Sequence, residues 1–345
     1  FRDLENKDLV DDNTLFRIAS MTKAITSTCI YQLIDKDILS LDTNLKDFFP
    51  EISDKKVIRG FDDNGDPILS DVSNDINIGH LLTHTSGFAY EIWNESIAKL
   101  VEKGDLQSAF ANNDEFLKAP LVFEPGSDWE YGIGIDWLGV LIEKINDCSL
   151  QEYMHTHIFE PLGMSNTSYD LDKNKHSRVA KVYGRNNDEY LEMPFEVPEK
   201  SSFYSGGGNL ISNLEDYSKF LRIFLNSGKG SKKQIISESS IASMLSSLNE
   251  ELVMKKMLTQ VPMLSNDVDF FPTSAKSWSP GFMVNHEDIK SGRPKNSSGW
   301  AGLFNSFFWI DPKNEIAALI LMQMLPFSED GCFTTLQEFE ASIYN

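Results

Sequence analysis

Ser20 and Lys23 stand three residues apart in the stretch FRIASMTKAITSTC, residues 16–29. Residues at i and i+3 share a helix face, so Ser20 Oγ and Lys23 Nζ can approach hydrogen-bond distance. A serine hydroxyl becomes a strong nucleophile when a neighbour takes its proton, and a lysine can do so if burial or nearby positive potential lowers its pKa. The pair therefore indicates nucleophilic catalysis, although Ser-x-x-Lys alone also fits a helix-capping serine and a solvated lysine.

The helix that must position this pair is predicted from hydrophobic periodicity. Apolar residues recur every four positions, at Met21, Ile25, Cys29 and Leu33. This stripe predicts a helix that ends near Lys36 and has Ser20 at its N-terminus. A helix N-terminus carries about half a unit of positive charge, which would stabilise an oxyanion formed at the serine.

The remaining pattern places helices in the middle of the chain and strands at its end. Helices are predicted at 78–84, 135–146, 150–159, 214–226 and 333–343, and strands at 281–285, 297–311 and 315–324, with a turn at Pro312–Asn314 between the last two. Residues 56–72 predict a hairpin that turns at Asn64-Gly65. We therefore expect an α+β fold, with a sheet domain built from both chain ends (1–45 and 270–345) and an inserted, mostly helical domain (46–269).

Five further segments carry a family resemblance. In chain order they are LLTHTSG (81–87), FEPGSDWEYGIGIDWLGVLIE (123–143), FEPLGM (159–164), SGGGNLIS (205–212) and SGWAG followed by FFWIDPK (298–313). Together with the Ser-x-x-Lys segment, this ordered set resembles the serine β-lactamase-like superfamily, in its class C and family VIII esterase branch with penicillin-binding-protein relatives. The resemblance implies an antiparallel sheet flanked by helices, a helical domain, and an active site in the cleft between them.

The resemblance also implies roles for individual residues. Ser20 matches the acylated nucleophile and Lys23 the lysine that shares its proton. Tyr131 matches the tyrosine that acts with the lysine as general base and then protonates the leaving group. The oxyanion hole would consist of the backbone N–H groups of Ser20 and Leu303.

Two departures from the family pattern bear on the substrate. Ile133 stands where β-lactamases have an asparagine, and Trp300 where they have a lysine, beside Ala301 and Gly302 on the strand next to the nucleophile. We expect these four residues to contact substrate. An isoleucine and a tryptophan suit neutral, apolar groups and supply no cation for a substrate carboxylate or for lowering the pKa of Tyr131.

These features predict a serine hydrolase that cleaves small, neutral carboxylic esters through an acyl-Ser20 intermediate. Three reactions on the same site stay open: β-lactam hydrolysis, D-amino-acid peptide hydrolysis and acyl transfer. Two alternatives from other classes stay open as well, a non-catalytic scaffold and a penicillin-binding receptor that acylates once. No Gly-x-Ser-x-Gly elbow for a Ser-His-Asp triad occurs in the sequence.

Net charge and hydropathy limit the classes of molecule that this protein is expected to bind. The 52 acidic residues against 31 basic ones give a net charge of -21, which disfavours nucleic acid and anionic membrane surfaces. No apolar run reaches the roughly 18 residues that a membrane helix needs, so we expect a soluble protein and a small-molecule ester as partner.

Only 19 residues precede Ser20, so elements of the fold could lie upstream, or an incomplete sheet edge could favour a homo-oligomer. The compartment is not predicted, with the cytoplasm slightly favoured over the periplasm.

Metal and cofactor sites are not expected. The acidic turn DDNGD resembles a calcium loop, but Gly60 occupies the first ligand position. His80 and His84 have zinc-ligand spacing without a third ligand nearby, and His84 is interpreted as a structural hydrogen-bonding residue. His155 and His157 are expected to be solvated, and the three cysteines to be buried thiols.

A glycine-rich loop and several aromatics complete the candidates. Ser205–Gly208 lacks the context of a phosphate loop and is interpreted as a packed loop near the active-site cleft. Two interpretations stay open for the aromatic residues in loops: they line an acyl pocket, or they only cover the hydrophobic core. These residues are Phe88, Tyr90, Trp93 and Phe203.

Overall fold

A five-stranded antiparallel sheet organises the computed structural model, which describes residues 1–186 and 189–344. Its strand order is β11-β10-β9-β8-β7. The strands are β7 (Lys276–Ser279), β8 (Phe282–Asn285), β9 (Ser298–Gly302), β10 (Ser306–Asp311) and β11 (Ile316–Ile320). The turn predicted at Pro312–Asn314 is confirmed between β10 and β11, where Asp311 pairs with Ile316.

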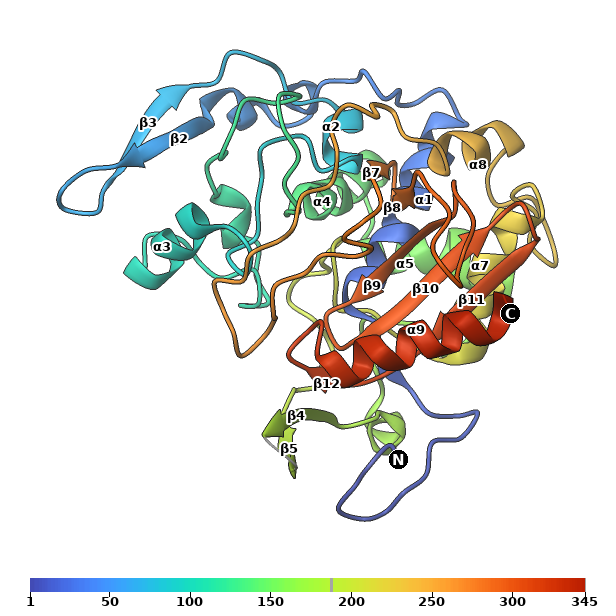
Figure 1. The fold of residues 1–345 in the computed structure, drawn as a ribbon. Helices are drawn as coiled ribbons and strands as arrows, with labels where there is room; N and C mark the ends of the chain where they lie inside the picture. Colours follow the sequence, from blue (N-terminus) through green and yellow to red (C-terminus); the bar gives the residue numbers. More distant parts are fainter. Residues whose placement is uncertain (187–188, 345) are drawn as a thin grey trace.

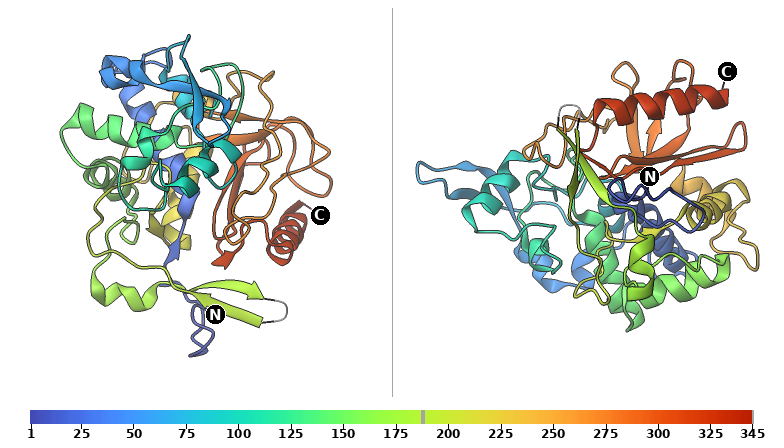
Figure 2. Two further views of the ribbon diagram at one scale, coloured as in Figure 1. Left: turned by 90° about the vertical axis from the view of Figure 1, so that its left-hand side faces the viewer. Right: turned by 90° about the horizontal axis from the view of Figure 1, so that it is seen from below.

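Helices cover both faces of this sheet (Figures 1 and 2). Successive residues of a strand point to opposite faces. Trp309 of β10 meets Phe339 of α9 (Asp330–Tyr344), with ring centroids 5.7 Å apart. The preceding residue, Phe308, meets Tyr217 of α7 (Leu214–Leu225) at 5.5 Å. The α+β class and the β-lactamase-like arrangement of an antiparallel sheet flanked by helices are therefore confirmed.

One detail of that expectation is wrong, because the sheet is not built from both chain ends. All five strands come from residues 276–320, whereas the N-terminal segment contributes only β1 (Phe16–Arg17). This strand pairs outside the sheet, with β6 (Ile211–Ser212). A separate sheet, β12-β4-β5, consists of Met324–Leu325, Val182–Asn186 and Glu189–Met193. The division into domains at 45 and 270 stays a prediction.

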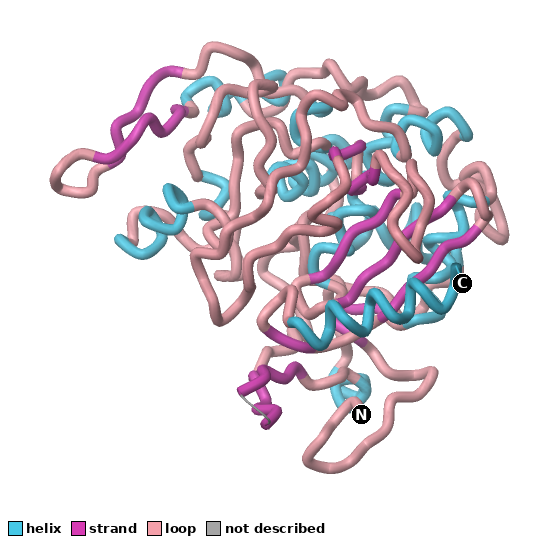
Figure 3. The backbone as a smooth tube through the Cα atoms, in the orientation of Figure 1, coloured by secondary structure: helices cyan, strands magenta, loops and turns pink. Residues whose placement is uncertain are grey.

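The helices predicted at 78–84, 135–146 and 214–226 are present in the middle region as α2 (Ile78–Leu82), α4 (Gly134–Asn146) and α7. The sequence pattern did not predict three further helices there, α3 (Glu95–Lys103), α6 (Glu160–Leu162) and α8 (Glu238–Met244). Short 3-10 turns occur at Leu45–Asp47, Pro50–Asp54, Glu115–Lys118 and Lys173–Arg178. The helix predicted at 150–159 is present but changes type along its length. Its first half is α5 (Leu150–Met154), and a π-helical turn over His155–Phe159 follows directly. Loops connect these helices over long stretches, as Figure 3 shows.

The predicted hairpin is confirmed as β2 (Lys56–Phe61) and β3 (Pro67–Asp71). Asp62 accepts the backbone N–H groups of Asn64 and Asp66 at 2.9 Å each. The acidic turn thus closes on its own backbone, as an Asx turn does.

Helix α1 (Thr22–Ile34) lies in the centre of the protein and packs on α4 and α5. The predicted helix is present, and every residue from Thr22 to Leu33 is buried, so the helix has no solvent-facing side. Thr26 Oγ1 donates to the Gly206 carbonyl at 2.7 Å and Thr28 Oγ1 to the Ala24 carbonyl at 2.8 Å, whereas Ser27 Oγ is buried without a hydrogen-bond partner. Because hydrogen bonds satisfy most of its polar side chains, the helix can be buried on all sides. Within the part of the chain that the structure describes, no helix is long and apolar enough to cross a membrane.

A buried ion pair ties α9 to the loop that precedes β9. Arg293 donates through its backbone N–H, Nε and Nη2 to the Glu340 carboxylate at 2.7–2.8 Å. Both residues are 4% exposed, and the guanidinium lies 4.5 Å from the centroid of Trp309.

We predict that Glu340→Gln destabilises the protein by about 3–5 kcal/mol, because it leaves the Arg293 charge buried without its partner. Urea unfolding followed by fluorescence measures this difference. Glu95→Gln is the matched control, since it removes a carboxylate from the exposed Glu95–Lys99 pair, and its unfolding midpoint should stay close to that of the wild type. Equal midpoints for Glu340→Gln and the wild type would contradict the role given to the buried pair.

Candidate active site

Ser20 lies in the 3-10 turn Ala19–Met21 that leads into α1, and Lys23 lies in the first turn of that helix. Lys23 Nζ donates to Ser20 Oγ at 3.2 Å, so the contact that the spacing predicted is present. Ser20 is half-buried, whereas Lys23 is 1% exposed. Ala19 has a φ of +42°, which is uncommon for a residue other than glycine. The serine is thus presented from a strained turn above a buried amine.

The surroundings of the Lys23 amine change its protonation. Besides Ser20, Nζ donates to the carbonyl of Gly207 at 2.7 Å and to Tyr90 Oη at 3.1 Å. Burial lowers the pKa of Lys23 to about 7, and the negative charge of Asp136 opposes this shift. A substantial fraction of the amine is therefore neutral near pH 7 and able to accept a proton.

Tyr131 lies beside the pair, with its ring centroid 4.9 Å from Lys23 Nζ. Its side chain is 1% exposed, and burial raises its pKa well above the ordinary value, although hydrogen bonding with Ser20 and Trp300 opposes the rise. The phenol therefore keeps its proton at neutral pH. In this state Tyr131 can donate a proton or relay one, but it is a poor base.

Trp300 takes a role that the sequence did not indicate. Its indole N–H donates to Tyr131 Oη at 2.9 Å, and its ring lies 4.4 Å from Trp278 and 5.5 Å from Phe270. At the position of the family lysine, the tryptophan thus holds the tyrosine directly. From the sequence one could expect only that a buried Tyr or Trp hydrogen-bonds its polar atom to some partner, without knowing which one. With 5% exposure, Trp300 offers a substrate little surface in this structure.

The end of β9 packs directly against the turn that carries Ser20. A Cβ on Gly302 would lie 2.5 Å from the Ile18 carbonyl oxygen, so only glycine fits there. Ala301 is 2% exposed and pairs with Phe307 of β10. Leu303 follows β9 at the start of the next turn, and its oxyanion role stays a prediction.

Ile133 lies in the core. It precedes α4 and is 2% exposed among hydrophobic neighbours. A substrate contact of Ile133, which the sequence predicted, would need surface that this structure does not offer.

Tyr90 and Asp136 are the polar site residues that sequence analysis missed. Tyr90 had been weighed only as a loop aromatic, yet its hydroxyl donates to Asp136 Oδ2 at 2.7 Å while accepting from Lys23. Asp136 lies in the first turn of α4 and is 1% exposed. The available signal was an acidic residue inside the apolar run GIDWLGVLI, where a charge needs a buried partner.

The loop Ser205–Gly208 is packed at the site, as predicted. A Cβ on Gly206 would lie 2.3 Å from the Ile135 carbonyl oxygen, and one on Gly207 would lie 2.5 Å from Tyr90 Oη and from Asp136 Oδ2. This close approach lets the loop supply the carbonyl that Lys23 bonds.

His84 holds the backbone on both sides of Tyr131. Its Nδ1 accepts the N–H of Gly132 at 3.3 Å, and its carbonyl accepts the N–H of Glu130 at 3.0 Å. Burial keeps its pKa well below the ordinary value, so the imidazole is neutral. The interpretation of His84 as a structural hydrogen-bonding residue is confirmed. His80 likewise caps α2 together with Asn77.

The remaining candidate histidines and loop aromatics differ in how close they lie to the catalytic side chains. His155 is exposed as expected, but His157 is half-buried against the Tyr153 ring at 4.4 Å. Trp93 is buried against Tyr131, with ring centroids 5.5 Å apart, so it lies at the site. Phe88 is buried in the core, and Phe203 packs on Phe116.

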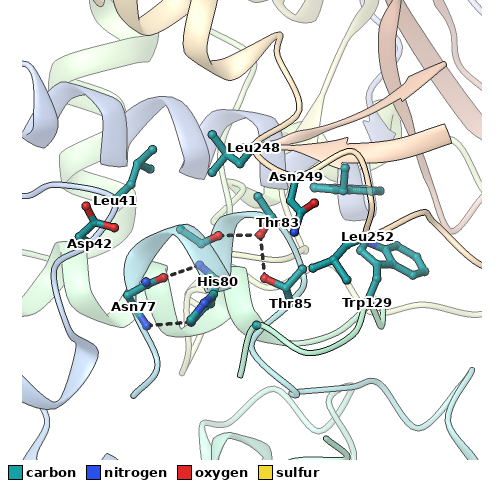
Figure 4. A pocket seen from close by; sticks show the side chains of 13 residues that line it. Leu41, Asp42, Asn77, His80, Thr83, Thr85, Trp129, Leu248, Asn249 and Leu252 are labelled. Atoms are coloured by element: carbon teal, nitrogen blue, oxygen red, sulfur yellow. Dashed lines mark hydrogen bonds between the residues drawn. The ribbon is translucent and has the colours of Figure 1, made fainter. Parts of the chain in front are cut away.

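A cavity of about 350 Å³ lies next to the aromatic residues around Tyr131 (Figure 4). Trp278 lines it and also contacts Tyr131, with ring centroids 5.7 Å apart. Thr83 and Thr85, which follow α2 and hydrogen-bond each other, also line it. The other lining residues are Leu41, Asp42, Asn77, Gly79, His80, Gly126, Trp129, Leu248, Asn249 and Leu252. Ser20 and Lys23 do not line it. Over residues 1–186 and 189–344, no cluster of three or more His, Cys, Asp or Glu side chains could hold a metal ion.

Comparisons with known proteins agree with this geometry. The Beta-lactamase family model matches residues 1–342. ML-236A carboxylate methylbutanoyltransferase of Penicillium citrinum is 28% identical over 346 residues, covering 96% of this chain and 81% of the relative. Lovastatin esterase of Penicillium rubens is 28% identical over 355 residues, covering 96% and 85%.

Solved structures give the same result. A mutant of simvastatin synthase from Aspergillus terreus has a TM-score of 0.84 at 26% identity, covering 100% of this chain and 84% of that one. The superfamily resemblance indicated by the motifs is thus confirmed. A family match over nearly the whole length, with enzymes among its relatives, shows that the chain belongs to the β-lactamase family of serine enzymes.

Proposed function

We propose that this protein transfers acyl groups from neutral carboxylic esters through an acyl-Ser20 intermediate. The observation that carries the proposal is the buried Lys23 amine, 3.2 Å from Ser20 Oγ, with a pKa lowered to about 7. An amine in this state can remove the serine proton at neutral pH, which is what a serine nucleophile requires.

The first half-reaction uses three side chains. Ser20 Oγ forms a bond to the ester carbonyl carbon while its proton passes to Lys23 Nζ. The carbonyl oxygen becomes an oxyanion, which the N–H groups of Ser20 and Leu303 would stabilise. The ester C–O bond then breaks, Tyr131 gives its proton to the departing alkoxide, and the Lys23 ammonium returns a proton to Tyr131. Because the pKa of Tyr131 is raised, we assign the base role to Lys23 alone instead of sharing it between the two.

The second half-reaction passes the acyl group to an acceptor. The deprotonation sequence repeats with an alcohol or water in place of Ser20, and the acyl group leaves the serine. We favour an alcohol, because the relatives include a methylbutanoyltransferase. Hydrolysis is the second candidate, supported by the relative named an esterase.

β-Lactam and D-amino-acid peptide hydrolysis are less well supported. Ile133 and Trp300 replace the asparagine and lysine of β-lactamases, and the Trp300 N–H is already bonded to Tyr131. Nitrocefin should therefore be turned over far more slowly than a p-nitrophenyl ester.

We predict that Ser20→Ala lowers kcat on p-nitrophenyl methylbutanoate at least about 10³-fold, because the acyl group loses its attachment point. Ser27→Ala is the matched control: it makes the same change two turns along α1, at a buried hydroxyl outside the Lys23 contacts. Wild-type product should shift from free acid to ester as an alcohol acceptor is added. Substantial turnover by Ser20→Ala would contradict the proposal, whereas a burst of one product equivalent would indicate a single-turnover receptor.

A second prediction concerns pH. The base form of Lys23 is lost below its pKa of about 7, so kcat/KM should fall about tenfold per pH unit below pH 7 and level off above it. Glu130 is the competing group, because burial raises its pKa to about 7 as well. In Glu130→Gln, kcat/KM should still fall below pH 7. A kcat/KM that no longer falls below pH 7 in this variant would contradict the assignment to Lys23.

A third prediction tests Trp300. Trp300→Phe keeps an aromatic ring but removes the N–H that holds Tyr131 Oη, so kcat should fall about tenfold with KM little changed. Steady-state kinetics on the same ester measures both constants. A change confined to KM would instead show that Trp300 acts by contacting substrate.

A further inference from the structure

A second tyrosine contacts the Lys23 amine on a side that the proposed reaction does not use. Tyr90 Oη accepts from Lys23 Nζ at 3.1 Å and donates to Asp136 Oδ2 at 2.7 Å. The three side chains come from distant segments: α1, the loop before α3, and the first turn of α4. Tyr90 is 8% exposed and Asp136 is 1% exposed, so the chain of contacts is shielded from water.

Neutral donors surround the Asp136 carboxylate. Oδ2 accepts from Tyr90, and Oδ1 accepts the Gly207 N–H at 2.9 Å and the Ser205 hydroxyl at 2.5 Å. A buried charge of this kind needs an opposite charge nearby. Lys23 provides it, because Tyr90 and the backbone of Gly207 each hydrogen-bond both residues.

The other groups that face Lys23 are neutral. Tyr131 and Tyr90 keep their protons because burial raises the pKa of both, and His84 is uncharged because burial holds its pKa low. Ser20 is a neutral hydroxyl. Asp136 is therefore the negative charge that acts on the amine.

We propose that Asp136, acting through the Tyr90 hydroxyl, is the counter-ion that stabilises the Lys23 ammonium formed when Ser20 is acylated. Both are positioning residues, and the inference rests on the proposed function of Lys23 as the base. During acylation the Ser20 proton moves to Lys23 Nζ, Tyr90 keeps its proton, and Asp136 stays ionised. Burial alone would leave the amine too weakly basic, and the carboxylate compensates for part of that effect.

The test measures the rate at which a fluorophosphonate probe labels Ser20, as a function of pH. Labelling needs a deprotonated Lys23 but no ester turnover, so it can succeed even if the proposed acyl transfer fails. In Asp136→Asn the ammonium loses its counter-charge, so the acidic limb of the labelling rate should move to lower pH by about 1 unit or more. Tyr90→Phe removes an acceptor of the ammonium and should move the limb in the same direction by less.

Tyr169→Phe is the matched control. Tyr169 is a buried tyrosine whose hydroxyl donates to the Ser205 carbonyl at 2.6 Å and does not contact Lys23. In Tyr169→Phe, the labelling rate should fall at the same pH as in the wild type. If Asp136→Asn fails to fold, the shift of the acidic limb in Tyr90→Phe tests the proposal instead. Asp136 keeps its bonds to Gly207 and Ser205 in that variant. An acidic limb that stays at the wild-type pH in folded Asp136→Asn or Tyr90→Phe would overturn the proposal.

Discussion

The burial of the Lys23 amine beside Ser20 is the constraint on which the rest of the site depends. An exposed lysine holds its proton up to about pH 10.4 and cannot serve as a base at neutral pH. Burial removes water from the amine and brings its pKa to about 7. The same burial would be costly without partners, because a desolvated cation must be hydrogen-bonded and compensated. The fold therefore has to bring acceptors and one carboxylate to a single nitrogen.

Those partners come from segments that pack without intervening side chains. Gly207 approaches so closely that an added Cβ would meet Tyr90 and Asp136, and Gly302 brings β9 against the carbonyl that precedes the Ser20 turn. Thr26 and Thr28 of α1 donate to nearby carbonyl oxygens, which helps the helix to lie inside the protein. His84 fixes the backbone around Tyr131 from both sides. The site is thus built largely from loops, and hydrogen bonds keep those loops in place.

Local features of the site could be predicted from the sequence, whereas long-range ones could not. The Ser20–Lys23 contact follows from helix geometry alone, and the turn at Asn64-Gly65 follows from backbone preference. The bond from Trp300 to Tyr131 joins residues 169 positions apart, so no spacing rule could indicate it. The motif resemblance placed both residues at the site but suggested that Trp300 faces substrate. Asp136 was missed because a single acidic residue in an apolar run does not reveal its partner. The sheet was partly misjudged, since periodicity identifies strands but not which segments pair.

The measurement that tests the central claim most directly is mass spectrometry of the protein mixed with an activated methylbutanoyl ester and quenched in acid. Cleavage after Arg17 and Lys23 releases residues 18–23, which contain Ser20. The account predicts an acyl adduct on Ser20 in this peptide, formed more slowly below pH 7 and discharged faster when an alcohol is present. An unmodified Ser20 during turnover, or an adduct on another residue that decays at the turnover rate, would contradict it.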